Sequence, residues 1–214
     1  MNYVGQNQPY DPQAWAQGGG YYKMAFQSGL VVPTLAAGGI IAAIQWKPAA
    51  QKDGRTYRFQ LKKFRCFVLT TTAFAAAQLV DCYLFKVRGF TGADTGGNQK
   101  LPATLDQKVK NGYPDSLFVG GGDIRVASTA ALAAGTRTPE ALPQATLASF
   151  WSAAIGASSP YPNEWTFDEH HVPIILDSGE GLEVQNGTAF GGTGGCKFFF
   201  DMEWMEEPYG THGW

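Results

Sequence analysis

Two carboxylates near the C-terminus, Asp201 and Glu203, have a spacing that hydrolysis or calcium binding can use. Residues two apart on a β-strand point to one face, where paired carboxylates can flank a glycosidic bond or bind Ca²⁺. The opposite face of this stretch carries Phe198, Phe200, Met202 and Trp204. This apolar stripe favours an amphipathic strand with solvated carboxylates, so we predict no catalytic residue here.

A second group of possible ligands comprises Glu169, His170 and His171. In an extended segment, adjacent side chains point to opposite faces, so the two histidines cannot easily bind one metal ion. The remaining histidine, His212, lies in the C-terminal tail. We therefore predict no metal site.

Glycine-rich stretches at 187–195, "GTAFGGTGG", and 119–123, "VGGGD", suggest loops that bind phosphate. Neither is followed by Lys-Ser/Thr, and the strand-like "CKFFFDMEW" rather than a helix follows the first. No Gly-x-Ser-x-Gly elbow occurs in the chain. We interpret both stretches as turns and predict no cofactor and no enzymatic activity.

The three cysteines, Cys66, Cys82 and Cys196, are odd in number and widely spaced. Such spacing matches neither a disulfide framework nor a CxxC metal site, so we expect each thiol to pack as a small apolar group. The first residues show no basic segment followed by an apolar run, so we expect synthesis and folding in a cytoplasm. We interpret the apolar run 29–46 as two short buried strands around a turn rather than a membrane span.

The composition bounds the possible partners. Among 214 residues, 16 are basic and 18 acidic, for a net charge of −2, so no field of one sign attracts nucleic acid or an anionic membrane. Charged residues make up only 16%, and 27 residues are glycine. This balance favours β structure and burial of surface in an assembly.

Hydrophobic alternation indicates the strands. Tyr57, Phe59 and Leu61 share one face, but after Lys62 and Lys63 the apolar phase slips by one residue, which predicts a β-bulge. The stretch 78–90 is apolar on both faces, as in a sandwich sheet that is also covered outside. A short helical turn is predicted at Thr138. The stretch 178–207 is predicted to be a closing hairpin whose 198–204 strand leaves Phe199 exposed for subunit contact.

We therefore predict an all-β sandwich over 25–207, with a long polar connection at 89–122, an N-terminal arm over 1–24 and a tail over 208–214. The arm is aromatic and nearly uncharged. We expect it to order against a neighbouring chain, the alternative being a disordered terminus. Its candidate contacts are Tyr3, Tyr10, Trp15, Tyr21 and Tyr22.

Three segments together resemble a group of tailed-bacteriophage virion structural proteins. They are "GFTGADTGGN" (89–98), "GGDIRVASTAALAAGTRT" (121–138) and "ILDSGEGLEVQNGTAFGGTGGCKFFFDMEWMEE" (175–207). The similarity extends in order from about residue 29 to 207, and the chain departs from the group at the arm and the tail.

The resemblance implies a β-sandwich or jelly roll on the outer surface of a phage capsid. Decoration, or cement, proteins of this kind commonly form homotrimers that brace the major capsid protein, so the implied partners are that protein and further copies of this chain. Nucleic acid and membranes are not expected partners. Two alternatives stay open: a tail-tip or fibre protein that binds a host glycan, and a glycan hydrolase that uses Asp201 and Glu203.

Overall fold

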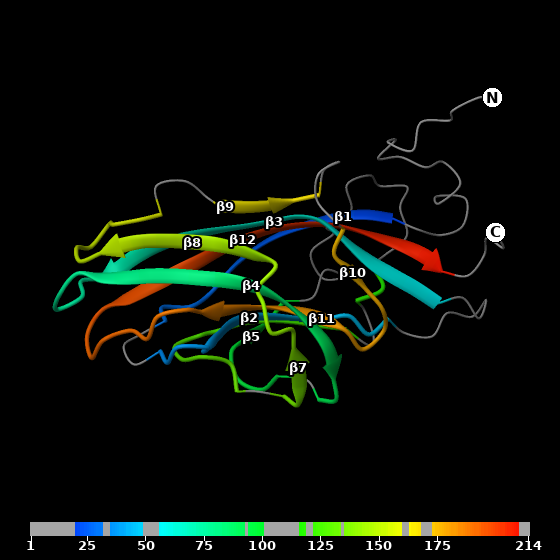
Figure 1. Cartoon of the computed structure of the whole chain (residues 1–214), viewed down its shortest axis with the longest axis horizontal. Helices are drawn as coiled ribbons and strands as arrows, with labels where there is room; N and C mark the ends of the chain where they lie inside the picture. Colours follow the sequence, from blue (N-terminus) through cyan, green and yellow to red (C-terminus); the bar gives the residue numbers. More distant parts are fainter. Residues whose placement is uncertain are drawn as a thin grey trace, which may run out of the picture.

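In a computed structural model, the chain folds into two antiparallel β-sheets packed face to face (Figure 1). The structure describes residues 20–31, 35–48, 56–92, 94–100, 116–118, 122–133, 135–159, 163–167 and 173–209. No helix occurs in these ranges, and therefore none that is long and apolar enough to cross a membrane. The prediction of an all-β sandwich is confirmed.

The first sheet has five strands and is built around the two longest strands in the described residues. Its order is β1 (Gly20–Gln27), β12 (Gly195–Tyr209) and β3 (Thr56–Thr72), with β10 (Ile175–Leu176) and β9 (Asn163–Thr166) both on the far edge of β3. All of these pairs are antiparallel. We call its solvent side the outer face of the five-stranded sheet.

The second sheet has seven strands. Its order is β5 (Asn98–Gln99), β6 (Asp123–Val126), β2 (Ile40–Gln45), β11 (Gly181–Asn186) and β4 (Gln78–Phe90), with β7 (Arg137–Pro139) and β8 (Ala145–Ser152) both on the far edge of β4. Every residue of β2 is buried. Ile40 and Ala43 pack on Leu132 outside the main core, so a loop covers the outer side of this sheet as well. The prediction that 78–90 is partly covered on both faces agrees with its burial pattern.

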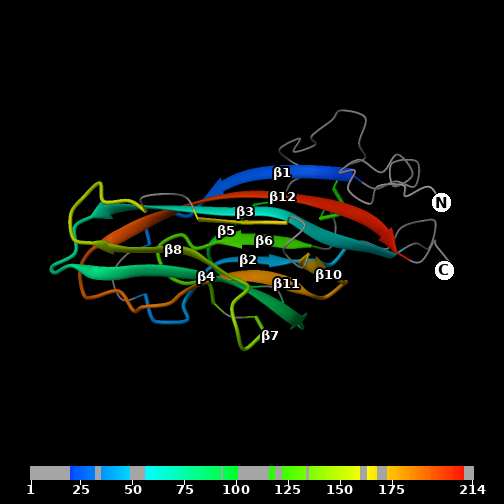
Figure 2. The same ribbon diagram turned by 45° about the horizontal axis from the view of Figure 1, so that its top comes forward.

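The pairing of strands is nested. The first strand pairs with the last, β1 with β12, and the second with the second-last, β2 with β11. The next two strands complete the pattern, because β3 pairs with β12 and β4 pairs with β11. The chain therefore alternates between sheets over β1 to β4, and the two layers are seen edge-on in Figure 2.

The predicted bulge in the 57–68 stretch is confirmed. Glu203 is opposite Lys63 and Trp204 is opposite Leu61, so Lys62 is the extra residue on β3. On either side of it, alternate residues from Tyr57 to Leu61 and from Phe64 to Val68 are buried. Because of the bulge, the apolar side chains before and after Lys62 all point into the core.

Aromatic rings fill one end of the core. The rings of Trp46 and Phe118 lie 5.0 Å apart, and Phe118 also contacts Trp204 at 5.8 Å, both edge to face. The Trp46 indole donates to the Tyr57 carbonyl (3.2 Å), which satisfies its buried N–H. Glu206, which is also buried, accepts bonds from the Ser116 hydroxyl (2.6 Å), the Leu117 amide and the Trp204 indole. The segment 116–118 is thereby fixed against β12.

Several sequence predictions need correction. The helical turn predicted at Thr138 is wrong, because residues 137–139 form β7. This strand lies at the edge of the sheet, where a proline, which has no backbone N–H to donate, is tolerated. The closing hairpin is wrong because 187–194 crosses from β11 in one sheet to β12 in the other. Pairing also moves two boundaries: β1 begins at Gly20, within the predicted arm, and β12 continues to Tyr209, within the predicted tail. In the described residues of the run 29–46, the structure has the strand β2 and an isolated bridge at Val31, where two short strands were expected; residues 32–34 lie outside the described residues.

Candidate assembly surface

Two phenylalanines lie side by side on the outer face of the five-stranded sheet. Phe199 on β12 is directly opposite Phe67 on β3, and their ring centroids are 5.9 Å apart. Gln27 of β1 is opposite Phe199 on its other side. Phe199 faces outward as predicted, but it is half-buried because the Phe67 ring covers part of it. The pair forms a small apolar patch at the surface.

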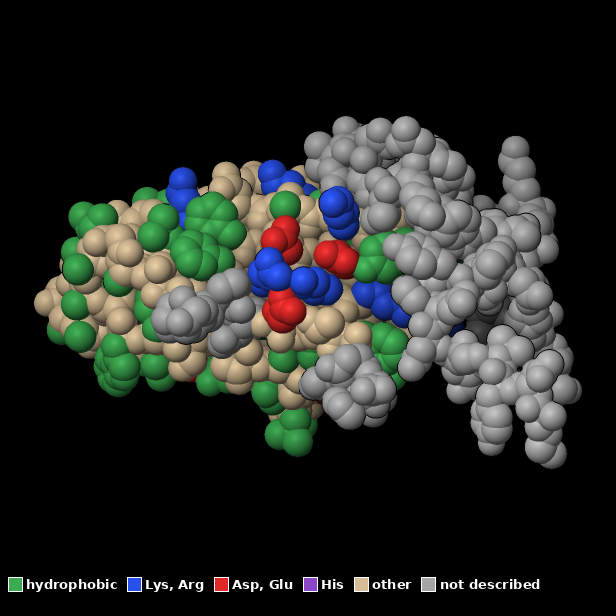
Figure 3. All heavy atoms as spheres, turned by 90° about the horizontal axis from the view of Figure 1, so that it is seen from above, with side chains coloured by type: hydrophobic (Ala, Val, Ile, Leu, Met, Phe, Trp, Pro, Cys, Tyr) green, Lys and Arg blue, Asp and Glu red, His purple; other side chains and the backbone are tan. Residues whose placement is uncertain are grey.

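A row of charged side chains crosses the same face beside the phenylalanines. Asp201 is opposite Arg65, and Arg65 is opposite Glu164. Arg65 donates to Glu164 Oε2 from Nε (3.0 Å) and Nη2 (2.7 Å), and Lys63 Nζ lies 3.4 Å from the same oxygen. The hydrogen bonds between Arg65 and Glu164 lower the pKa of Glu164 and raise the pKa of Arg65. Figure 3 shows basic and acidic side chains interleaved at the centre of this face, where ion pairs such as Arg65 with Glu164 partly neutralise the charges.

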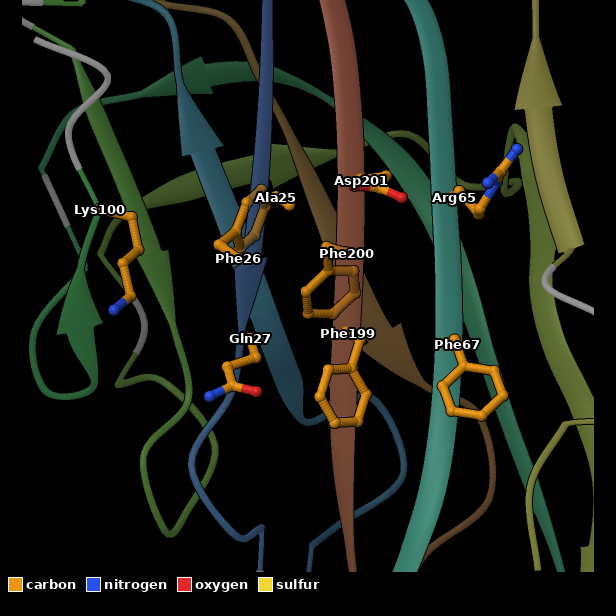
Figure 4. Close-up of a pocket in the computed structure, with 9 residues that line it drawn as sticks. All are labelled: Ala25, Phe26, Gln27, Arg65, Phe67, Lys100, Phe199, Phe200 and Asp201. Atoms are coloured by element: carbon orange, nitrogen blue, oxygen red, sulfur yellow. The ribbon is translucent and has the colours of Figure 1, made fainter. Parts of the chain in front are cut away.

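A hollow of about 510 Å³ lies over these rows. The aromatic side chains of Phe67 and Phe199 line it together with Gln27, Arg65 and Asp201. Lys100 reaches the hollow from the far side of β1, across from β12 (Figure 4). Apolar and aromatic side chains with a few polar groups are the usual lining of a site that binds a small molecule.

The carboxylates Asp201 and Glu203 lie on this outer face, as the alternation predicts. Asp201 is exposed, and Glu203 accepts a 2.6 Å hydrogen bond from the Tyr21 hydroxyl on β1. Lys23 and Lys63 are opposite Glu203 on the two neighbouring strands. Cross-strand pairing of this kind stabilises a sheet surface and gives both carboxylates a structural role.

The predicted contact residues divide into three groups. Phe199 and Tyr21 lie on the outer face, whereas Tyr22 is only 1% exposed and stacks on Trp204 at 5.5 Å. Tyr22 is therefore a core residue and not an assembly contact, because the strand alternation of β1 turns it inward. The third group, which lies outside the described residues, comprises Tyr3, Tyr10 and Trp15. The possible metal ligands also lie outside them: Glu169, His170, His171 and His212.

All three cysteines are buried and free, as the sequence predicts. Burial raises the pKa of the Cys196 thiol to about 11 and that of Cys66 well above its usual value. Both groups are therefore thiols rather than nucleophilic thiolates at neutral pH. Within the described ranges, no three His, Cys, Asp or Glu side chains are placed to hold a metal ion.

A buried ion cluster joins the three segments that carry the phage resemblance. Arg137, from the second segment, donates from both terminal nitrogens to Asp94 in the first, the Nη1 bond being 2.9 Å long. Its Nε lies 3.3 Å from an oxygen of Glu183 in the third segment. Burial raises the pKa of Glu183. Sequence reasoning missed this cluster, because its members lie far apart along the chain.

Backbone geometry explains the glycines beside Asp94. Gly96 and Gly97 have φ angles of 74° and 61°, in the left-handed region that glycine adopts without strain. A Cβ on Gly97 would also lie 2.3 Å from the Val126 carbonyl. The "DTGG" sequence thus lets the loop after β4 fold tightly against β6.

Three large apolar side chains are exposed at sites that the sequence analysis did not identify. Leu142 is 76% exposed, Trp151 71% and Ile155 70%. Trp151 is opposite Leu79 on the seven-stranded sheet, and Ile155 lies in the turn after β8. The run "ASFWSAAIG" mixes both faces of β8, so periodicity alone does not say which aromatic residue points outward.

Comparisons with known proteins give no relative from which a function can be transferred. No protein-family model, no curated protein and no solved structure matches this chain.

Proposed function

We propose that this chain is a capsid decoration protein of a tailed bacteriophage, which binds the outer surface of the capsid and braces the lattice of the major capsid protein. The observation that carries this proposal is the convergence of the three resembling segments on one buried cluster, Asp94, Arg137 and Glu183. A buried polar network of this kind rigidifies a fold and helps to specify its core. The contact supports interpreting the three segments as parts of one scaffold.

We further propose that the sandwich is a jelly roll. In that topology a long hairpin is folded over so that strands pair in a nested order and successive strands alternate between two sheets. The pairs β1 with β12 and β2 with β11, and the shared neighbours β3 and β4, support this assignment. Jelly rolls are common in viral capsid proteins, which agrees with the proposed setting.

The outer face of the five-stranded sheet is the proposed contact surface. It carries the Phe67–Phe199 patch beside paired charges such as Arg65 with Glu164, which favours binding through shape and apolar contact. Self-association, as the homotrimer that the resemblance implies, and attachment through residues 1–19 belong to the same proposal. Because β1 begins at Gly20, the arm must be removed without cutting into residues 20–24.

The test uses particles of the source phage stripped of this protein. Purified chain is added back, and bound protein is measured after sedimentation, for the wild type, a 1–19 deletion and Phe199→Gln. We expect many wild-type copies distributed over the capsid and reduced occupancy for both variants. Full occupancy by both variants, or wild-type protein only at one vertex, would contradict the proposal.

A second candidate is a tail-tip protein that binds a host glycan. The hollow over Phe67 and Phe199 favours it, because sugars pack an apolar face on aromatic rings while Asp, Arg and Gln side chains bond their hydroxyls. Copy number separates the two functions. A few copies at the tail, together with glycan binding that Phe67→Ala abolishes, would favour this candidate.

A further inference from the structure

Two of the buried thiols face each other across the sandwich. Cys66 lies on β3 of the five-stranded sheet and Cys82 on β4 of the seven-stranded sheet, and their sulfur atoms are 3.8 Å apart. Both side chains are 0% exposed. The fold therefore brings two thiols from different sheets into contact in the core.

We propose that Cys66 and Cys82 are a disulfide site, and that oxidation at this pair covalently links the two sheets. A disulfide has an S–S length of about 2.05 Å, so the sulfurs must approach by somewhat less than 2 Å. The surroundings favour this movement. Cys82 adjoins a bulge in the β4–β8 pairing, and its neighbour on β8 is the small residue Ala148. This inference does not depend on the proposed function.

The third thiol has a different environment. Cys196 on β12 lies 3.8 Å from the Thr70 hydroxyl, which occupies its sulfur as a hydrogen-bond partner. Its side chain is as fully buried as the other two. Cys196 therefore serves as an internal control, with the same burial but without the facing sulfur that Cys66 and Cys82 share.

The oxidant is a small-molecule disulfide such as oxidised glutathione. One protein thiolate attacks it and forms a mixed disulfide, which releases one glutathione thiolate; the second protein thiolate then attacks the mixed disulfide and releases the other. Two protein thiols and one small disulfide thus yield one protein disulfide and two small thiols. Because both sulfurs are enclosed in the folded chain, the bond forms during folding, or when the sandwich opens, in an oxidising environment.

The protease trypsin makes the site easy to identify. It cuts after Arg65 and Lys86 and nowhere between them, so Cys66 and Cys82 fall in one peptide, while Cys196 falls in another. The full chain is refolded in a buffer of reduced and oxidised glutathione, denatured, alkylated with a maleimide, digested and analysed by mass spectrometry. We expect one alkylated cysteine, Cys196, and an unalkylated 66–86 peptide lighter than its reduced form by two hydrogen atoms.

Single substitutions identify the partners. Cys196→Ala is expected to form the bond like the wild type, whereas Cys66→Ala and Cys82→Ala are expected to keep their two remaining thiols alkylatable. A reductant should lower the thermal midpoint of oxidised wild type and oxidised Cys196→Ala, and should not change that of Cys82→Ala. Three alkylated thiols in refolded wild type, or loss of both remaining thiols in Cys66→Ala, would overturn the proposal.

Discussion

Arg137 and Asp94 form a bidentate ion pair in which both side chains are at most 5% exposed. The pair spans β7 and the loop after β4. The Gly135 amide adds a further hydrogen bond to Asp94 at 3.2 Å. Glu183, on the outer side of β11, completes the cluster at 3.3 Å from Arg137. One cation thus stands between two buried carboxylates and fixes a loop over the seven-stranded sheet.

Replacing Arg137 with Met should strongly destabilise the fold. The change leaves Asp94 and Glu183 buried without a counter-charge, and breaking a buried pair in this way costs about 3–5 kcal/mol. The measurement is the free energy of unfolding from urea denaturation. Arg65→Met is the matched control, because the exposed pair of Arg65 with Glu164 contributes about 1 kcal/mol or less. Equal losses for the two variants would contradict the role assigned to the cluster.

The sequence predicted structure correctly where the hydrophobic alternation within one strand was enough to decide it. Alternation and its slip at Lys62 located β3 and its bulge, and the apolar stripe of β12 identified which of its residues face the core. The same phase places Glu206 on the core side with Trp204, a signal that was present but unused. Register between strands is set by three-dimensional pairing. Periodicity therefore did not predict that Phe67 adjoins Phe199, nor that the last two strands belong to different sheets.

Local propensity failed where tertiary pairing decided the structure. The glycines and tyrosines at 18–22 resemble an unstructured arm, yet residues from Gly20 onward form β1 because β12 offers an edge to pair with. Likewise, Thr138 and Pro139 resemble a helix start, but β4 pairs with them instead. Sequence alone could not weigh these long-range contacts against the local preference.

Deleting Lys62 should prevent folding. Lys62 is the extra residue of the bulge, so its removal shifts the preceding part of β3 by one position and turns Tyr57, Phe59 and Leu61 away from the core. At a typical 2–5 kcal/mol each, these three buried side chains together contribute about 6–15 kcal/mol, which is comparable to the whole stability of an ordinary domain, roughly 5–15 kcal/mol. Circular dichroism and soluble yield provide the measurement.

Lys62→Ala is the control for the deletion, because it removes the side chain and keeps the bulge. Its amine donates to Gln60 and lies 4.8 Å from the Phe167 ring, contacts that contribute about 1 kcal/mol. A folded deletion variant with native stability would mean that the strand tolerates a changed register.

Phe199→Gln should lower particle binding by about tenfold or more, since a central aromatic contact commonly contributes more than 1.4 kcal/mol. The substitution leaves the core stripe of β12 unchanged, because Phe199 points to the outer face. Occupancy on stripped particles is measured beside the thermal midpoint, so that a loss of stability can be distinguished from a loss of contact.

Trp151→Gln is the comparison for that experiment. Trp151 is the more exposed residue, but it lies on the seven-stranded sheet, away from the proposed contact surface. We expect it to retain occupancy. If Trp151→Gln lost particle binding and Phe199→Gln retained it, the contact surface with the capsid would lie at the β8 edge and not on the outer face of the five-stranded sheet.

The buried carboxyl of Glu206 should make stability fall as pH rises. Burial raises its pKa from 4.5 to about 7 in the folded chain. Between these values the folded state binds a proton that the unfolded state has released, so the stabilisation is complete below about pH 4.5 and is lost as pH rises through about 7. At about 1.36 kcal/mol per pKa unit, the whole effect is about 3 kcal/mol.

Glu206→Gln isolates this effect from the other titrating groups, which include Glu183 with a raised pKa and Glu164 with a lowered one. Glutamine does not ionise, so the free energy of unfolding of the wild type relative to the variant should decline by about 3 kcal/mol from pH 4.5 to 8. Parallel pH profiles for wild type and Glu206→Gln would mean that the carboxylate keeps its charge in the core, held by Ser116, Leu117 and Trp204.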